Sequence, residues 1–230
     1  MISVWRICFS HLALSFTLAA SVVSGSVDIV GVRGHDDDVQ AVVWLEPENG
    51  ELPPRQPAVV RMLQRHKQFQ PHLLAIRTGT SVEFPNDDPM FHNAFSNIDG
   101  KRFDVGLYPP GSSRRVVFDR PGIVRIFCNI HQSMSAVIVV ENTPWISVSD
   151  KHGEFRIADV PPGRYTLNVF YERATRQTLD ALRRTIEVRE QATSLPAIRI
   201  SCAGYIPVPH RNKYGLEYPP ESGTSYGTSP

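Results

Sequence analysis

Short apolar segments separated by glycine and proline constrain this chain more than any other feature of its sequence. Leu73–Ile76, Ser113–Phe118 and Gly122–Phe127 are examples, each too short for a typical helix and bounded by turn-forming residues. The 230 residues include 19 prolines and 15 glycines, which favour short strands and tight turns. The pattern predicts an all-β protein of antiparallel sandwiches rather than a parallel sheet covered by helices.

The expected strands form two groups, which predicts two sandwich domains. The first group lies within residues 27–142, and the second, smaller group lies within residues 143–203, beyond a break at Asn142 and Pro144. The expected strands are Ala41–Leu45, Leu73–Ile76, Ser81–Phe84, Phe103–Leu107, Ser113–Phe118, Gly122–Phe127 and Ser135–Val140 in the first group, and Trp145–Val148, Glu154–Ile157, Arg164–Tyr171, Arg183–Val188 and Ala197–Ile200 in the second.

Both ends of the chain differ from these domains in composition. Residues 1–26 contain one basic residue, Arg6, then a short apolar run interrupted by polar residues, and then small residues. This layout is typical of a secretory signal peptide, and an uncleaved membrane anchor is the alternative. We therefore expect a periplasmic protein with no stable membrane span after cleavage. Residues 204–230 are rich in Pro, Gly, Ser, Thr and Tyr without apolar periodicity, which predicts a flexible tail.

Charge and cysteine content narrow the function further. The chain carries 24 Lys and Arg against 23 Asp and Glu, so its net charge of +1 predicts no nucleic-acid partner. Of its three cysteines, Cys8 leaves with the expected signal peptide. A disulfide between Cys128 and Cys202 is one possibility in an oxidising compartment. The surroundings of Cys128 favour a different role.

Cys128, His131 and Met134 form a C-x2-H-x2-M run between two expected strands. A short loop joining paired strands can direct a thiolate, an imidazole and a thioether at one point. His92, in a loop rich in proline and aspartate, is the candidate for a fourth ligand. Soft sulfur ligands with imidazole favour copper over magnesium, calcium or manganese. Zinc competes for such a site, but structural zinc prefers closed sets of Cys and His without a thioether.

Two histidines and one cysteine with a weak axial methionine are the ligand set of electron-transfer copper sites. The set predicts one type 1 copper centre that cycles between Cu(I) and Cu(II) in a one-electron carrier. Four protein ligands leave no open position for a substrate, which argues against an enzyme. Two alternatives remain: a non-redox copper carrier or sensor that docks a partner through its second domain, and a cysteine hydrolase using Cys128 and His131.

The residues around these ligands resemble the plastocyanin-like cupredoxins over about residues 70–140. The resemblance rests on Phe84, Pro85, Asn86, Asp87, His92, Asn93, Phe127, Cys128, Asn129, Ile130, His131 and Met134, and the tight spacing from Cys128 to Met134 is similar to that of amicyanin.

The resemblance to cupredoxins implies a Greek-key sandwich and a role for each ligand. His92 and His131 would bind copper through ring nitrogens, Cys128 through sulfur and Met134 axially. Asn93 would tie the ligand loop together beside the cofactor. A redox partner protein such as a cytochrome or a dehydrogenase is implied, with the electron passing through the edge of His131. Gln132 and Ser133 stand where relatives carry a proline and an aromatic residue, which puts the usual apolar docking patch in doubt.

More narrowly, the two-domain arrangement is similar to bacterial methylamine-utilisation-like periplasmic proteins. In that resemblance the second domain corresponds to a carboxypeptidase-regulatory-like, transthyretin-like sandwich, which is not itself a peptidase. The residues that carry it are Asp150, Gly153, Phe155, Pro162, Gly163 and Tyr165.

Overall fold

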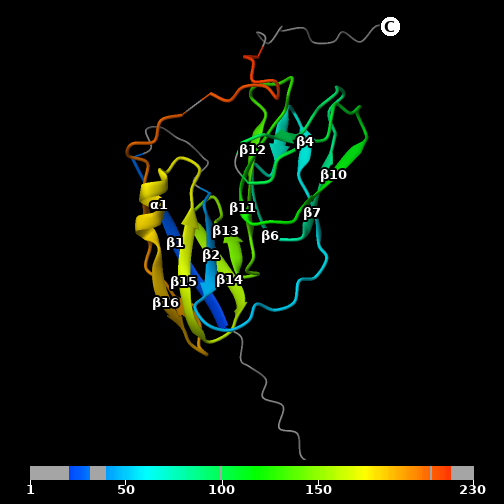
Figure 1. The fold of residues 1–230 in the computed structure, drawn as a ribbon. Helices are drawn as coiled ribbons and strands as arrows, with labels where there is room; N and C mark the ends of the chain where they lie inside the picture. Colours follow the sequence, from blue (N-terminus) through cyan, green and yellow to red (C-terminus); the bar gives the residue numbers. More distant parts are fainter. Residues whose placement is uncertain (1–20, 32–39, 99, 208, 219–230) are drawn as a thin grey trace, which may run out of the picture.

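The regular structure of this protein is almost entirely β-strand, arranged as two domains packed side by side (Figure 1). The predicted all-β fold class is confirmed. Within the described part of the chain the one helix is α1 (Arg176–Leu182), and no helix there is long and apolar enough to cross a membrane. The computed structural model describes residues 21–31, 40–98, 100–207 and 209–218.

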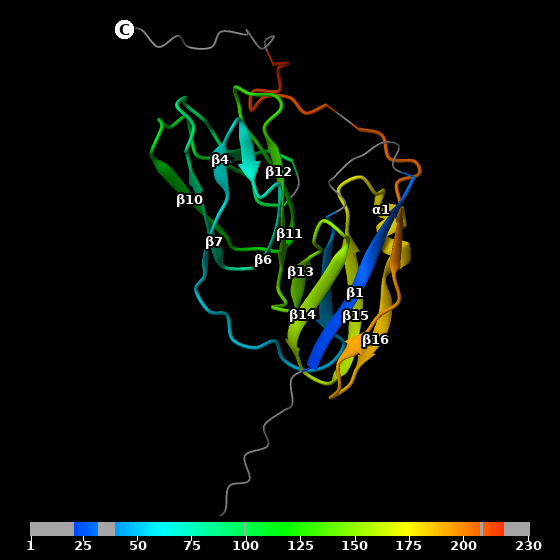
Figure 2. The ribbon, with the colours of Figure 1, turned by 180° about the vertical axis from the view of Figure 1, so that it is seen from behind.

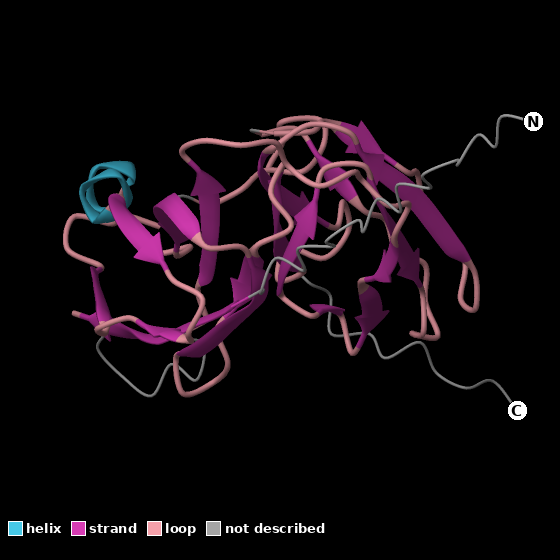
Figure 3. Cartoon of the chain, turned by 90° about the horizontal axis from the view of Figure 1, so that it is seen from below, coloured by secondary structure: helices cyan, strands magenta, loops and turns pink. Residues whose placement is uncertain are grey.

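One domain is assembled from both ends of the described chain, and we call it the flanking domain. Its strands are β1 (Ser21–Val30), β2 (Val42–Pro47), β13 (Ile146–Val148), β14 (Glu154–Val160), β15 (Gly163–Phe170), β16 (Arg184–Val188), β17 (Thr193–Ser194) and β18 (Ile198–Ser201). One sheet has β1 paired with β14, β17 and β18, and the other has the order β13-β2-β15-β16 (Figure 2). Figure 3 shows the strands and the helix of the described residues from below. The N-terminal strands therefore depend on C-terminal partners in both sheets.

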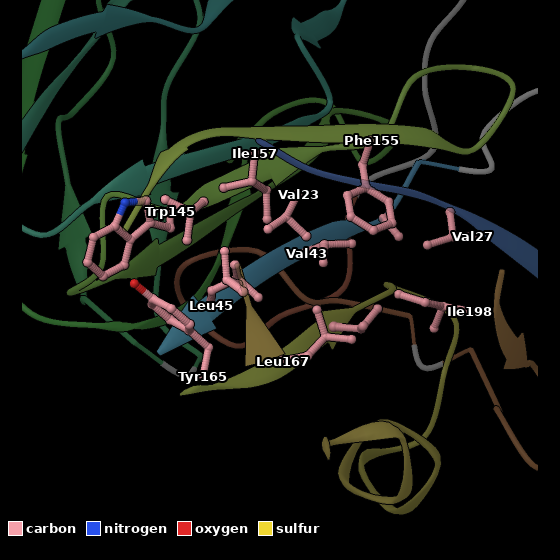
Figure 4. Packing of buried hydrophobic residues seen from close by; sticks show 14 of the residues in the cluster. Val23, Val27, Val43, Leu45, Trp145, Phe155, Ile157, Tyr165, Leu167 and Ile198 are labelled. Atoms are coloured by element: carbon pink, nitrogen blue, oxygen red, sulfur yellow. The ribbon is translucent and has the colours of Figure 1, made fainter. Parts of the chain in front are cut away.

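The core of the flanking domain lies between its two sheets (Figure 4). Val23 of β1, Leu45 of β2 and Leu167 of β15 are fully buried there. Trp145 and Tyr165 pack edge to face at one end of this core, with ring centroids 5.3 Å apart. Because apolar residues alternate along these strands, one face of each sheet turns inward and supplies the core.

The second domain is inserted between β2 and β13, and we call residues 58–142 the inserted domain. Its strands are β3 (Val59–Arg61), β4 (Leu63–Arg65), β5 (Gln68–Gln70), β6 (Leu73–Arg77), β7 (Thr80–Pro85), β8 (Phe95–Ser96), β9 (Phe103–Asp104), β10 (Ser113–Phe118), β11 (Gly122–Phe127) and β12 (Ser135–Glu141). They form a sheet of order β10-β7-β3, a sheet of order β6-β12-β11-β8-β9, and the hairpin β4-β5.

The two domains share an apolar interface in which β12 is buried on both faces. Ile138 lies in the core of the inserted domain. Its neighbours Val137 and Val139 belong to a separate cluster that contains Val42 of β2 and Phe170 of β15. Successive strand residues point to opposite faces, so a strand buried on both sides reads as a continuous apolar run. The inserted domain is thus packed sheet against sheet on the flanking domain.

The domain boundaries differ from those expected from the sequence. Residues 27–142 were predicted as one domain, but β1 and β2 belong to the flanking domain, where Trp44 pairs with Ile146. Residues 143–203 form a complete sandwich only together with these N-terminal strands. The reason is that apolar alternation identifies a strand but carries no information about its partner strand.

The expected signal peptide over residues 1–26 also differs from the structure at its end. Residues 1–20 lie outside the described residues, but β1 begins at Ser21 and pairs Val23 with Ile157. A leader ending at residue 26 would remove Val23, which is fully buried. The small residues that suggested a cleavage region are strand residues of the flanking domain.

The expected flexible tail over residues 204–230 is ordered in part. After β18 the chain crosses to the inserted domain, where Asn212 is 9% exposed (Figure 1, orange to red). The Lys213 N–H donates to Asn129 Oδ1 at 3.0 Å. Individual hydrogen bonds and one aromatic stack, of His210 on Phe127, hold this segment in place of an apolar stripe, which is why its composition suggested disorder. Residues 219–230 lie outside the described residues.

Glu141 at the end of β12 makes stability depend on pH. Burial, together with the nearby charge of Glu46, raises the pKa of Glu141 to about 7. The folded state then binds this proton more tightly than the unfolded state does. The resulting stability is present below the ordinary carboxyl pKa and is lost as pH rises through 7.

We therefore expect Glu141→Gln to raise the free energy of unfolding at pH 8 by about 2 kcal/mol, allowing for partial exposure. At pH 4 the substitution should change little, because Glu141 is then protonated in both states. Urea unfolding at the two pH values tests this. An equal gain at pH 4 and pH 8 would contradict the assignment.

Candidate metal centre

Two loops at one end of the inserted domain carry the predicted ligands. His92 lies between β7 and β8, where its backbone N–H donates to the Tyr108 carbonyl at 3.2 Å and its carbonyl accepts from the Tyr108 N–H at 2.9 Å. The other three predicted ligands lie between β11 and β12. There the Cys128 N–H donates to the Met134 carbonyl and the Met134 N–H donates to the His131 carbonyl, each at 3.1 Å. This loop is a tight extension of the β11-β12 hairpin.

The structure brings His92, Cys128 and His131 together at one point. Cys128 Sγ lies 4.0 Å from His92 Nδ1 and 3.7 Å from His131 Nδ1. One ligand atom from each residue lies within 4.8 Å of the others. Three ligands with bonds of about 2.0–2.3 Å around one metal ion lie roughly 3.5–4 Å apart. The donor atoms therefore have the spacing that a single bound ion requires.

Met134 lies at the end of the same loop and is fully buried. Its side chain belongs to the core cluster that also contains Cys128. A buried thioether in the same cluster as a buried thiol is compatible with the expected axial ligand. The alternative disulfide does not form, because Cys128 and Cys202 are both free.

The Cys128 sulfur is buried but has several hydrogen-bond donors around it. Burial raises the pKa of the Cys128 thiol, while backbone N–H groups of Ile130, Asn93 and His131 donate to the sulfur and act in the opposite direction. Such N–H groups stabilise a thiolate, and a bound cation would complete its stabilisation. The pocket thus suits a metal thiolate better than an isolated charge.

His92 is oriented by a carboxylate that sequence reasoning missed. Its Nε2 lies 2.7 Å from Asp88 Oδ2, and both side chains are almost completely buried. Burial lowers the pKa of His92 against the opposing effect of Asp88, which favours the neutral imidazole that binds metals. A proton on Nε2 leaves Nδ1, the atom facing Cys128, available as a ligand. The signal in the sequence was an aspartate four residues before the ligand, in a loop interpreted only as a turn.

Asp88 is itself held in place by backbone donors from the β4-β5 turn. It accepts hydrogen bonds from the His66 N–H at 2.6 Å and the Lys67 N–H at 2.8 Å. Burial alone would raise the pKa of Asp88, but its hydrogen bonds with Lys67, His92 and His66 outweigh burial and hold the pKa below its ordinary value. The carboxylate stays charged and fixes the imidazole.

Asn93 joins the His92 loop to a third segment. Its Nδ2 donates to Asp104 Oδ1 at 2.8 Å and to the Gly106 carbonyl at 2.9 Å. Its backbone N–H donates to Cys128 Sγ. The Asn93 side chain therefore ties the His92 loop to the segment from Asp104 to Gly106.

We expect Asp88→Asn to weaken metal binding by about 10- to 100-fold, because the amide cannot accept all three hydrogen bonds or favour the same imidazole tautomer. Competition with a chelator of known affinity measures the change. Asp87→Asn is the matched control, since Asp87 is adjacent and exposed. Equal affinities for the two variants would show that Asp88 does not orient His92.

Comparisons with known proteins find similarity only among solved structures. No family model matches the chain, and no curated protein matches it. The oxidized P94A mutant of amicyanin is 17% identical, with a TM-score of 0.35 over 36% of this chain and 83% of that chain. A purple cupredoxin from Nitrosopumilus maritimus is 24% identical, with a TM-score of 0.32 over 36% of this chain and 99% of that chain.

The copper-containing nitrite reductase from Thermus scotoductus SA-01 is 27% identical, with a TM-score of 0.34 over 49% of this chain and 28% of that chain. Each of these similarities covers less than half of the chain. The chemistry of the centre is therefore inferred from its own side chains.

Proposed function

We propose that this chain is an exported one-electron carrier with one type 1 copper centre held by His92, Cys128, His131 and Met134. The main support is the position of Cys128 Sγ, which lies 4.0 Å from His92 Nδ1 and 3.7 Å from His131 Nδ1. A thiolate, two imidazoles and a thioether suit copper in both oxidation states. Bound copper would supply reversible one-electron chemistry.

The protein side chains favour electron transfer over catalysis. Cys128 and His92 are fully buried, so neither is accessible to a substrate, which argues against a cysteine hydrolase. Four protein ligands would leave no open coordination position for turnover at the metal. His131 is half-buried, whereas the other three proposed ligands are buried, so His131 is the most exposed of the four. We propose that the electron enters and leaves through its ring edge.

Exposed apolar side chains near the ligands in sequence support docking of a redox partner protein, such as a cytochrome or a dehydrogenase. Phe91 is 53% exposed, Leu107 is 52% exposed and Ile130 is 39% exposed. Phe91 and Ile130 directly precede ligands, and Leu107 precedes Tyr108, which pairs with His92. An apolar surface can thus form despite Gln132 and Ser133.

Export to the periplasm completes the proposal. The basic residue and apolar run before Ser21 resemble a cleavable leader, and a cut before Ser21 would leave β1 intact. N-terminal sequencing of the mature protein from a periplasmic fraction tests this boundary. A mature chain that begins after Ser21 would contradict it.

Addition of Cu(II) to the purified protein tests the type 1 centre. We expect an intense visible thiolate-to-copper band, narrow copper hyperfine splitting in the electron paramagnetic resonance spectrum, and reversible voltammetry. A colourless complex would refute the type 1 centre. A coloured complex that exchanges no electrons with a cytochrome would refute the carrier function and favour a non-redox copper protein that docks through the flanking domain.

A further inference from the structure

The chain returns to the metal centre after it has completed the flanking domain. Residues 209–218, which we call the C-terminal strap, lie against the loops that carry the ligands (Figures 1 and 2). The strap follows β18 of the flanking domain, so a segment anchored in one domain contacts the functional site of the other. The four predicted ligands could bind a metal ion without this segment, so its contacts need a separate explanation.

The strap makes two contacts with the chain at Cys128. The Tyr218 hydroxyl donates to the Cys128 carbonyl at 2.8 Å. The His210 ring stacks on Phe127, with ring centroids 4.1 Å apart and 16° between the planes. Within the strap, His210 meets Tyr218 edge to face at 5.2 Å. These rings cover the backbone immediately around the ligand cysteine.

Lys213 extends the contact to the loop that contains His92. Its Nζ lies 2.8 Å from Asp104 Oδ2, and the other Asp104 oxygen accepts from Asn93 Nδ2 at 2.8 Å. The Lys213 backbone N–H donates to Asn129 Oδ1 on the Cys128 loop. Lys213 therefore contacts the Cys128 loop directly and is linked to the His92 loop through Asp104.

His210 acts here as an aromatic packing residue. Its Nε2 is buried and has no hydrogen-bond partner among the described residues. Burying a nitrogen without a hydrogen bond costs free energy. The ring contacts with Phe127 and Tyr218 are therefore the contribution of His210 to this segment. Replacement by phenylalanine should preserve this role.

We infer that the C-terminal strap is a part of the metal centre, in which Tyr218 and Lys213 are positioning residues that hold the two ligand loops together before a metal binds. Loops fixed in advance lose less conformational freedom when the metal binds, which strengthens binding and slows release. The strap also keeps solvent from the cysteine. This inference rests on the proposed function only for the identity of the metal.

Alkylation of Cys128 by iodoacetamide in the metal-free protein measures this positioning directly. Peptide mass spectrometry separates Cys128 from Cys202, which serves as an internal reference. We expect deletion of residues 209–230 to accelerate Cys128 alkylation about tenfold or more, since several contacts are lost. Deletion of residues 219–230 alone should leave the rate unchanged. Equal rates for the two deletions in folded proteins would overturn the inference.

Point variants keep the inference testable where the longer deletion fails to fold. Tyr218→Phe should accelerate alkylation about fivefold, because one hydrogen bond to the Cys128 carbonyl is lost. Leu216→Ala is the control on the same strap, since the Leu216 side chain is 62% exposed. His210→Phe should match the wild type, whereas His210→Ala should accelerate alkylation. A Tyr218→Phe protein that reacts as slowly as Leu216→Ala would overturn the role of Tyr218.

Copper release to a chelator gives a second readout, and its rate should rise in Tyr218→Phe by about the same factor. A wild-type protein without the visible thiolate band would refute the copper proposal while leaving the alkylation result to decide on the strap. Unchanged alkylation in Tyr218→Phe with a normal visible band would refute the strap alone. The two proposals therefore fail separately.

Discussion

Replacement of Cys128 by serine is expected to abolish the visible thiolate-to-copper band completely and to weaken Cu(I) binding strongly. Cys128 supplies the only thiolate within the cluster formed with His92 and His131. A hydroxyl oxygen is a hard and weakly acidic donor, and it cannot replace a soft thiolate toward copper. The fold should survive, since serine is nearly the same size and the surrounding N–H groups can donate to its oxygen.

Absorption spectra after Cu(II) addition and competition with a Cu(I) chelator measure this loss. Cys202→Ser is the matched control, because Cys202 is the other free cysteine of the described chain and is absent from the cluster. It should retain the band and the affinity. A band that survives in Cys128→Ser, or disappears in Cys202→Ser, would place the thiolate ligand elsewhere.

Replacement of Val139 by aspartate is expected to lower the free energy of unfolding by about 4 kcal/mol or more, which is enough to unfold many domains. Val139 is fully buried in the interface where β12 faces the flanking domain. A carboxylate there would lose its hydration inside an apolar cluster. Because β12 belongs to both the inner core and the interface, the loss should destabilise the inserted domain rather than merely separate two intact domains.

Urea unfolding followed by circular dichroism measures the effect of Val139→Asp. Val117→Asp is the control, since Val117 is also a strand valine of the inserted domain but is 48% exposed. It should cost less than about 1 kcal/mol. Similar losses for both variants would falsify the claim that the outer face of β12 is a structural interface.

Strand positions were the most predictable part of this fold. The expected strands Ser113–Phe118 and Gly122–Phe127 coincide with β10 and β11. Both are bounded by glycine, proline or polar turn residues, and such residues end strands through local conformational preferences. Local preferences are encoded within a few residues, so they can be recognised without knowledge of the rest of the chain.

Strand partners were much less predictable than strand positions. Ser24 of β1 pairs with Arg156 of β14, although the entire inserted domain lies between them in the sequence. The buried side chains of β1 and β2 are compatible with any apolar face. From the sequence, β2 and the end of β1 were therefore assigned to the domain over residues 27–142, and residues 21–26 of β1 to the expected signal peptide. The partner of each strand is determined by how complete sheets pack together, and this is a property of the tertiary structure.

The candidate site also contains residues that could be predicted from the sequence and residues that could not. His92, Cys128 and His131 were recognisable because metal ligands are chemically distinctive residues at restricted spacings, and the structure brings them together. Asp88 and Tyr218 were missed because each contacts its ligand residue through a single hydrogen bond. Aspartate in a proline-rich loop and tyrosine in a polar tail are common, and only three-dimensional proximity reveals what they hold.

The insertion also sets the order in which the molecule can be completed during synthesis. A ribosome releases the N-terminus first, so β1 and β2 emerge long before β13, β14 and β15, with which they pair. The inserted domain can close as soon as β12 has emerged, while Val137 and Val139 still lack their cover from β15. The strands of the inserted domain can therefore pair before the flanking domain is complete, but the metal centre is finished only when the C-terminal strap has followed β18 and Tyr218 reaches the Cys128 carbonyl.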